Sequence, residues 1–306
     1  MSNTDVLIVG SGPAGITAAI YAFRKGLSVR IFEKGLIGGV ASDAIMVENY
    51  PGFEGLSGMD LMQKMKKHLE KFGMKIELNE VKAIVKKLNV FEIEAGKEKF
   101  NAKSVILATG TKNKMLGIPG ENELKGKGIA YCATCDGFFY KGKDVAVIGA
   151  GNSGVMAAIY LSDICKKVYL VEFLDEMMCD EIYKKKLEKL KGKNLELHLG
   201  TALTEISGSG KVNGIKIKNR KSNAENEIAL DGVFMYAGLI PQSELAKKAG
   251  AKITEKGFIK VSENMETSVK GIFAAGDVTG ELAQIVSAAG SGAKAAVSAY
   301  NYIKGI

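Results

Sequence analysis

One pattern occurs twice in this sequence: a short apolar strand, a glycine-rich turn, a helix, and a second apolar strand that ends in glutamate. The glutamates are Glu33 and Glu172, and each stands eighteen residues after the last glycine of its turn. Apolar runs of this kind are typical of strands buried on both faces of a parallel sheet. A repeat this close predicts two units of the same α/β fold.

Each turn is suited to binding a dinucleotide. Its glycines permit a tight turn and a close approach to a pyrophosphate, and the helix that follows offers unpaired N–H groups to the phosphates. The glutamate can accept hydrogen bonds from a ribose diol. The candidate cofactor-binding residues of the first copy are Gly10, Gly12, Pro13, Ala14, Gly15 and Glu33. The candidate nucleotide-binding residues of the second copy are Gly149, Gly151, Asn152, Ser153, Gly154 and Glu172.

Two further apolar strands are predicted. One ends in the small residues Ala108, Thr109 and Gly110, whose backbone can lie against a cofactor, and the other ends in Gly276 and the acidic residue Asp277. A helix rich in small residues is expected to follow, from about 283 to 302. Because the second repeat lies between these strands, we predict an α/β protein with two Rossmann-like, three-layer β/β/α domains, the second inserted into the first. The predicted boundaries are 1–113 with 242–306 for the outer domain and 114–241 for the inserted domain.

Cys132 and Cys135 lie between the two glycine-rich turns and are followed at once by Asp136. Two thiols three positions apart can form a disulfide with little backbone movement, so the pair can hold two electrons as a dithiol and release them. The adjacent carboxyl can supply a proton. The alternatives are half of a zinc site, which needs about four ligands, or an inert buried pair. The other candidate ligands form no second paired motif; they are Cys165, Cys179, His68 and His198.

Composition narrows the remaining function classes. The chain has 306 residues, of which 46% are hydrophobic and 25% charged, as is ordinary for a globular protein of about two domains. No apolar run approaches the roughly 18 residues that a membrane span needs, and no basic segment of a signal peptide begins the chain. A cytoplasmic protein without a membrane partner is therefore expected. Too few aromatic residues stand beside the lysines for a nucleic-acid partner.

The formal net charge of +8 is divided unevenly between the predicted domains. The outer domain has 24 Lys+Arg and 18 Asp+Glu, a net charge of +6, while the inserted domain has 18 and 16, a net charge of +2. The basic runs alternate with apolar residues at helical spacing and are typical of solvated helix faces. An acidic partner is the alternative explanation.

Taken together, these residues resemble the low-molecular-weight thioredoxin reductases over essentially the whole chain. The resemblance rests on the first glycine turn with Glu33, on residues 108–110, on the Cys-Ala-Thr-Cys-Asp-Gly run at 132–137, and on Gly276 with Asp277. It implies FAD as the cofactor, a homodimer, and a thioredoxin or glutaredoxin-like protein as the electron acceptor. It also implies that Cys135 faces the flavin, that Cys132 attacks the substrate disulfide, and that Asp136 acts as the proton donor.

The same resemblance assigns further flavin contacts. Residues 108–110 would form a second contact with FAD, and Asp277 would bind its ribityl chain. Gly38, Gly39 and Asn49 would line the isoalloxazine. The start of the last helix, at Gln284 and Ile285, would point at the ring.

The inserted domain departs from the NADPH-dependent members of this family. Those members have an acidic pair in the glycine helix, and a His-Arg-Arg segment with a further Arg that holds the 2'-phosphate. The corresponding residues here are Met156, Ala157, Glu172, Phe173, Leu174 and Met178, and Ala283 replaces an arginine that usually precedes Gln284. We therefore expect no cation to pair with the phosphate, and Glu172 to oppose it as a like charge.

The predicted electron donor is accordingly reduced ferredoxin, reduced deazaflavin or NADH rather than NADPH. Related archaeal and anaerobic flavoproteins that lack these motifs use ferredoxin or deazaflavin, and an acidic ferredoxin would suit the positive outer domain. Two other function classes remain open. An electron-transfer flavoprotein or flavin peroxide reductase would pass electrons to a different acceptor, and a redox-sensing module would bind without turnover.

Overall fold

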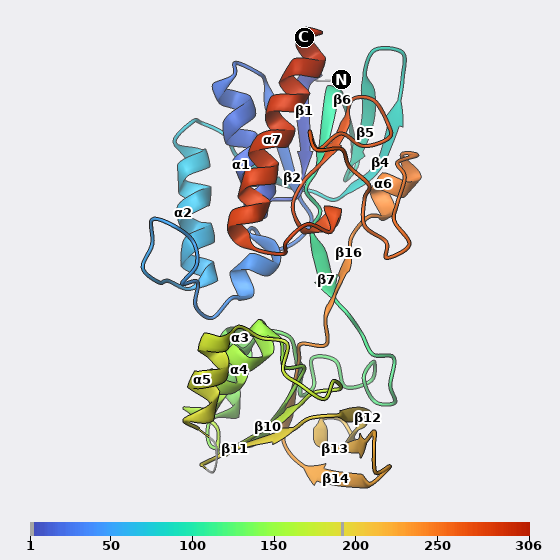
Figure 1. Cartoon of the computed structure of the whole chain (residues 1–306). Helices are drawn as coiled ribbons and strands as arrows, with labels where there is room; N and C mark the ends of the chain where they lie inside the picture. The colour runs from blue at the N-terminus through green and yellow to red at the C-terminus, as the bar shows by residue number, and fades with distance from the viewer. Residues whose placement is uncertain (1–2, 191–192) are drawn as a thin grey trace. The chain divides into compact units, whose positions relative to one another are not determined.

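The computed structural model describes residues 3–190 and 193–306, which divide into two compact units. The first unit comprises Met1–Ser42, Met46–Lys112 and Ile240–Ile306, and the second comprises Asp43–Ile45 and Asn113–Leu239. The chain enters the second unit along β7 (Thr111–Asn113) and returns along β16 (Leu239–Pro241), and these two short strands pair with each other. Each unit is built on a parallel sheet with helices, which confirms the expected fold class (Figure 1).

The first unit contains a sheet with the strand order β3-β2-β1-β6-β5-β4, in which β17 also pairs with β6. The start of β6 pairs antiparallel with β5 and its end pairs parallel with β17, so this one strand joins the parallel sheet to the antiparallel hairpins. The strands are β1 (Asn3–Val9), β2 (Val29–Glu33), β3 (Ile76–Leu78), β4 (Val81–Lys86), β5 (Phe91–Ala95), β6 (Glu98–Leu107) and β17 (Ile272–Ala274).

Both faces of the central strands in this unit are buried. In β1, Val6 and Ile8 belong to the core beneath the helices, while Leu7 and Val9 belong to the core on the opposite face. Side chains alternate across a strand, so a continuous apolar run fills both cores. The helices on one side of the sheet are α1 (Pro13–Arg24), α2 (Gly58–Glu70) and α7 (Ile285–Lys304) (Figure 1).

The second unit repeats this plan with a five-stranded parallel sheet in the order β11-β10-β9-β15-β8 and a separate antiparallel sheet, β12-β13-β14. Val145 and Val147 of β9 pack under the helices, whereas Ala146 and Ile148 pack toward the antiparallel sheet. The strands are β8 (Ile129–Ala130), β9 (Asp144–Ile148), β10 (Lys167–Val171), β11 (Leu195–His198), β12 (Thr201–Gly208), β13 (Val212–Asn219), β14 (Glu225–Ala229) and β15 (Gly232–Met235). The helices are α3 (Ala133–Asp136), α4 (Asn152–Ser162) and α5 (Glu181–Glu188).

Four further short helices are present in the described chain. Three are 3-10 helices, η1 (Gly39–Asp43), η2 (Gly137–Tyr140) and η3 (Asp277–Thr279), and the fourth is the α-helix α6 (Glu244–Lys248). The last helix starts two residues later than predicted, because Gln284 is its N-cap and keeps an extended backbone. It ends where Gly305 adopts a φ of 73°, the left-handed conformation typical of a helix C-terminus. Within residues 3–190 and 193–306, no helix is long and apolar enough to cross a membrane.

Candidate active site

The first glycine turn connects β1 to α1, and two of its glycines are required by packing. Gly10 has a φ of 104°, and a Cβ there would overlap the carbonyl oxygen of Ala108 at the end of β6. A Cβ on Gly15 would overlap the carbonyl oxygen of Gly10. At Gly12 the nearest atom to such a Cβ, the Gly38 carbonyl oxygen, is 3.7 Å away. The turn is therefore tight on its protein side and open at the start of α1, where N–H groups are available to a pyrophosphate.

Glu33 at the end of β2 is bonded to this turn. One carboxylate oxygen accepts hydrogen bonds from the N–H and the hydroxyl of Ser11, both at 2.9 Å, and the other accepts from the N–H of Gly35 at 2.8 Å. A carboxylate offers about four acceptor positions, so Glu33 retains capacity for a ribose hydroxyl. Its first role in the structure is to fix the turn to β2.

The other predicted FAD residues of the first unit converge near this turn. A Cβ on Gly276 would stand 2.9 Å from the Cβ of Ala14 in α1, which brings the end of β17 against the first glycine helix. The side chain of Asn49 donates to Gln284, the N-cap of α7, at 2.9 Å, and Ile285 is the first residue of that helix. Burial raises the pKa of Asp277, the carboxyl that follows Gly276.

Backbone contacts place the rest of this predicted set. Gly38 donates its N–H to the carbonyl of Ser11 at 3.1 Å, and Gly39 begins η1. Gln242 holds both Thr109 and Gly110. The Thr109 hydroxyl donates to the carbonyl of Gln242 at 2.6 Å, and the N–H of Gln242 donates to the carbonyl of Gly110 at 2.9 Å. The contact between Gln242 and Thr109 was not predicted from the sequence. Gln242 occupies a segment more than 130 residues further along the chain, so no local motif connects it with Thr109.

These residues fit a flavin dinucleotide. The open side of Gly12, the free start of α1 and a partly buried carboxyl at Asp277 lie in one unit and offer donors to phosphates and an acceptor to a polyol chain. Ser291 of α7 adds a further constraint, since its hydroxyl accepts the N–H of Gly276 at 2.9 Å. When bound, FAD would supply a two-electron carrier to this unit.

Cys132 and Cys135 form a disulfide in the second unit, with Cα atoms 5.3 Å apart. Cys132 is the N-cap of α3, and Cys135 lies in its single turn. The sulfur of Cys132 accepts a hydrogen bond from the N–H of Cys135 at 3.2 Å and stands 3.3 Å from the hydroxyl oxygen of Thr134. Both donors would stabilise negative charge on this sulfur after reduction.

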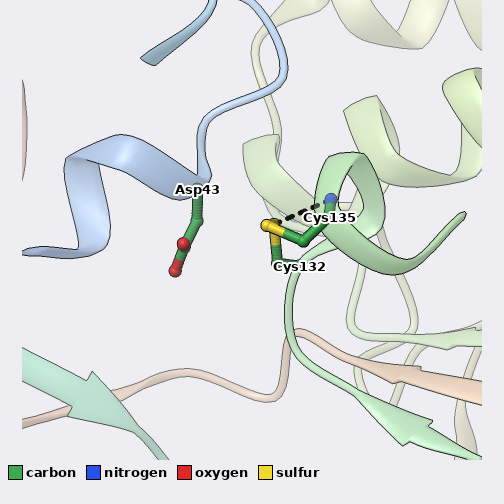
Figure 2. Close-up of side chains that lie close together, drawn as sticks. All are labelled: Asp43, Cys132 and Cys135. Carbon is green, nitrogen blue, oxygen red and sulfur yellow. Dashed lines mark hydrogen bonds between the residues drawn. A yellow bond between two sulfur atoms is a disulfide. The ribbon is translucent and has the colours of Figure 1, made fainter. Parts of the chain in front are cut away.

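Two carboxyl groups stand near the disulfide. Asp136 ends α3, and burial raises its pKa, which favours the protonated form that a proton donor requires. Asp43 belongs by its contacts to the second unit, and one of its carboxylate oxygens and both cysteine sulfurs lie within 4.8 Å of one another (Figure 2). Burial, and next the charge of Asp136, raise the pKa of Asp43 to about 6. Asp43 was missed from the sequence because nothing in its own segment marks it as a partner of the cysteines.

The same three side chains are the group of described residues that could offer ligands to a metal ion. Cysteine binds metal as a thiolate, and in the disulfide neither sulfur is one. The group also has fewer than the four ligands of a structural zinc site. Its chemistry in this state is that of a disulfide with nearby acids.

The two cysteines differ in accessibility. The side chain of Cys132 is buried, whereas Cys135 is exposed. Immediately after them, Phe138 and Phe139 of η2 are 72% and 70% exposed. Two adjacent exposed phenyl rings are an unusual surface feature, and aromatic residues are enriched where proteins bind one another. These rings were overlooked in the sequence, although their position three residues after a redox pair could have indicated them.

The second glycine turn reproduces the first in detail. Gly149 has a φ of 103°, and a Cβ there would overlap the carbonyl oxygen of Tyr236, which stands where Ala108 stands in the first turn. Glu172 is buried, and its carboxylate accepts the N–H groups of Ala150 and Leu174. Glu172 therefore repeats the structural role of Glu33. Asn152 is also engaged, because its side chain exchanges hydrogen bonds with the side chain and N–H of Asp180.

The sequence did not identify an arginine that lies beside the loop after β10. Arg220, which follows β13, places its guanidinium 4.1 Å from the ring centroid of Phe173 and donates to the Phe173 carbonyl at 3.0 Å. Phe173 directly follows Glu172, so an arginine does stand beside the loop after β10. Sequence motifs could not reveal it, because the contact depends on how the antiparallel sheet packs. Arg220 is nevertheless a single cation, stacked and already bonded.

Fold and site together define a flavin-dependent disulfide oxidoreductase of two nucleotide-binding units. The sequence matches the pyridine nucleotide-disulphide oxidoreductase family over residues 4–292. The chain belongs to this family, and its resemblance to the low-molecular-weight thioredoxin reductases is confirmed by its relatives. It is 38% identical over 302 residues to the thioredoxin reductase of Bacillus subtilis (strain 168), covering 98% of this chain and 95% of that one.

Solved structures agree with this assignment. The thioredoxin reductase of T. acidophilum is 45% identical and superposes with a TM-score of 0.94, covering 98% of this chain and 99% of that chain. A ferredoxin-flavin thioredoxin reductase from Clostridium acetobutylicum is 33% identical with a TM-score of 0.55, and the match covers 100% of both chains. The family confirms the expected FAD cofactor and disulfide oxidoreductase class.

Proposed function

We propose that this protein is a thioredoxin reductase, which passes electrons from a donor through FAD to the Cys132–Cys135 disulfide and on to the disulfide of a thioredoxin or glutaredoxin-like protein. The observation that carries the proposal is the disulfide itself, set beside a carboxyl of raised pKa and two exposed phenyl rings. Thiol–disulfide exchange needs a thiolate, a proton donor and access for the partner. Relatives named thioredoxin reductase support the acceptor class.

The roles of the residues follow from this chemistry. Cys132 is the nucleophile that forms the mixed disulfide, because its sulfur is the one that accepts the Cys135 N–H and faces Thr134. Cys135 is the thiol that exchanges electrons with the flavin. Asp136 supplies the proton that converts the sulfur of Cys135 to a thiol when the disulfide opens. The buried position of Cys132 means that it has to become accessible before a protein disulfide can reach it.

Phe138 and Phe139 would form the contact with the redoxin. Replacing both with alanine should raise the KM for an oxidised thioredoxin by about 10- to 100-fold, which corresponds to a combined contribution of about 1.4 to 2.8 kcal/mol from two aromatic contacts. The kcat and the rate of flavin reduction should remain close to those of the parent. Initial rates across a panel of oxidised thioredoxins, with dithionite as the reductant, measure this.

Phe173→Ala is the matched control, since Phe173 is an exposed phenylalanine of the same unit that follows β10. It should leave the KM for thioredoxin unchanged. If the pre-reduced parent is reoxidised by oxygen or dyes but by no redoxin, the alternative is correct: an electron-transfer flavoprotein or flavin peroxide reductase component with another acceptor.

The electron donor is proposed to be reduced ferredoxin, ahead of reduced deazaflavin and NADH, with NADPH a poor donor. Glu172 is buried beside the second glycine turn, so a 2'-phosphate there would meet a carboxylate in a poorly solvated position. Arg220 offsets part of this repulsion, but it is one cation that already serves Phe173. The outer segments of the chain carry a net charge of +6, which would attract an acidic protein.

A ferredoxin donor predicts a salt dependence that the small donors do not. Its rate of flavin reduction should fall steeply with salt, because the Debye length shrinks from about 30 Å at 0.01 M to about 10 Å at 0.1 M. Anaerobic stopped-flow reduction with ferredoxin, deazaflavin, NADH and NADPH at both ionic strengths measures this, and reduction by NADH or deazaflavin is the internal control. A ferredoxin rate indifferent to salt, or rapid reduction by micromolar NADPH, would contradict the proposed donor.

A further inference from the structure

Tyr236 is a partly buried tyrosine whose backbone and side chain contact two different segments of the second unit. It follows β15, and its N–H donates to the carbonyl of Ile148 at 2.7 Å. Its carbonyl lies against Gly149, and its Cβ is 3.4 Å from the position that a Cβ on Gly154 would take. The backbone of Tyr236 is therefore fixed by the end of β9 and by the second glycine turn.

The side chain of Tyr236 reaches the redox helix. Its hydroxyl oxygen accepts the N–H of Ala133 at 3.1 Å. Ala133 is fully buried and is the first residue of α3, a position whose N–H has no partner within the helix. Leaving such a donor unbonded in a buried site is unfavourable, so this hydroxyl satisfies a requirement of the helix.

We propose that Tyr236 is a positioning residue of the redox centre: its hydroxyl fixes the Ala133 peptide and so holds the turn that presents the Cys135 N–H to the Cys132 sulfur. This inference goes beyond the proposed function and rests only on the dithiol–disulfide chemistry of the site. Tyr236 does not touch the sulfur in this role. It acts through the backbone between the two cysteines.

The chemical step that depends on this turn is the opening of the disulfide. Two electrons, which a bound reduced flavin would supply, break the S–S bond and leave negative charge on both sulfurs. A proton from Asp136 converts the sulfur of Cys135 to a thiol, and the sulfur of Cys132 remains a thiolate. The thiolate is a stronger acceptor than the disulfide sulfur, so its bond from the Cys135 N–H gains importance on reduction. A turn held by Tyr236 therefore favours the dithiol state.

Burial raises the pKa of Tyr236 to about 12, against the opposing effect of the Ala133 N–H. The phenol thus keeps its hydrogen and remains neutral wherever the protein is active. The acids that act on this hydroxyl are Asp43 and Asp136, and Tyr140 of η2 lies within reach of Asp136. All three are unchanged in the variants below, so a shift in the thiol pKa reports on Tyr236 itself.

The test is Tyr236→Phe, which keeps the ring and its packing and removes only the hydroxyl. In a Cys135→Ser background, alkylation of Cys132 by iodoacetamide as a function of pH should show its thiol pKa raised by about one unit. In the protein with both cysteines, equilibration with a dithiothreitol redox buffer should show the disulfide favoured about tenfold, equivalent to about 30 mV. Tyr169→Phe, on β10, is the control and should change neither value.

A second variant identifies the bond concerned. Ala133→Pro removes the N–H that Tyr236 accepts, at a first helical position where proline is tolerated and after Cys132, whose extended backbone suits a following proline. When Ala133→Pro is combined with Tyr236→Phe, at least half of the change in the disulfide–dithiol equilibrium constant should be reversed, because no N–H donor is then left unbonded at position 133. A double variant no better than Tyr236→Phe overturns the assignment of the effect to this bond.

An unchanged thiol pKa and an unchanged equilibrium constant in Tyr236→Phe, with only a lower Tm, would show a merely structural tyrosine and overturn the proposal. Neither readout uses a redoxin or a physiological donor. Failure of the proposed acceptor or donor would therefore leave these measurements unaffected, and the two kinds of failure can be told apart.

Discussion

Cys132→Ser is expected to reduce electron transfer to a protein disulfide to background while leaving FAD bound and reducible. The reason is that a serine hydroxyl cannot form the mixed disulfide through which thiol–disulfide exchange proceeds. The residues proposed to bind FAD belong to the other unit, and the substitution does not change them. Flavin content, anaerobic reduction by dithionite and turnover with an oxidised thioredoxin measure the three expectations separately.

The comparison with Cys135→Ser assigns the two roles. The structure leaves Cys135 more exposed than Cys132, so exposure alone would make Cys135 the attacking thiol. The hydrogen bonds favour Cys132, because its sulfur has both the Cys135 N–H and the Thr134 hydroxyl as neighbours. Under our assignment, Cys135→Ser still forms a stable mixed disulfide with a thioredoxin at Cys132, and Cys132→Ser forms none. The opposite trapping pattern would reverse the roles.

Cys165→Ser provides the control for both variants. Burial raises the pKa of Cys165 to about 11, so this thiol is almost wholly protonated at neutral pH and is a poor nucleophile. Its removal should leave turnover and mixed-disulfide formation at the parent level. If Cys165→Ser lost as much turnover as Cys132→Ser, the loss could not be assigned to the Cys132–Cys135 pair.

The parallel sheets and their turns could be predicted because they depend on local signals. An apolar run followed by glycines at fixed spacing allows one arrangement of strand, turn and helix, and the overlap that a Cβ would cause at Gly10 and Gly15 shows why those positions exclude side chains. Helix ends were less accurate. The small-residue pattern gives a start for the last helix near residue 283, whereas the helix begins at Ile285, after the extended backbone of its N-cap Gln284.

Contacts between distant segments could not be predicted from the same signals. Gln242 binds Thr109, Arg220 stacks on Phe173, and Tyr236 caps Ala133, and each pair is brought together by sheet packing. Glu172 shows that a correct alignment does not by itself establish a residue's role. The sequence correctly aligned it with Glu33, but the structure shows that both carboxylates bond first to their own turns, so a glutamate at this position is no proof of a ribose partner.

Asp136→Asn is expected to slow the reduction of the disulfide by about 100-fold, the lower end of the usual contribution of a general acid, with FAD binding intact. Burial raises the pKa of Asp136, so its carboxyl remains protonated to higher pH than an exposed aspartate. The rate of the parent should therefore be greatest at low pH and fall as pH rises through this raised pKa. The rate of the asparagine variant should not show this fall.

The neighbouring Asp43, with its pKa raised to about 6, could contribute a second titration in the same range. Asp43→Asn separates the two carboxyl groups: it removes the charge that Asp43 places near the sulfurs but leaves Asp136 in position. We expect a modest shift of the pH profile from Asp43→Asn and the loss of its descending limb from Asp136→Asn. Stopped-flow measurement of the flavin–disulfide step between pH 5 and pH 9 decides between them. If Asp136→Asn reacts at the parent rate across that range, Asp136 serves only to end α3, and the proton comes from another group.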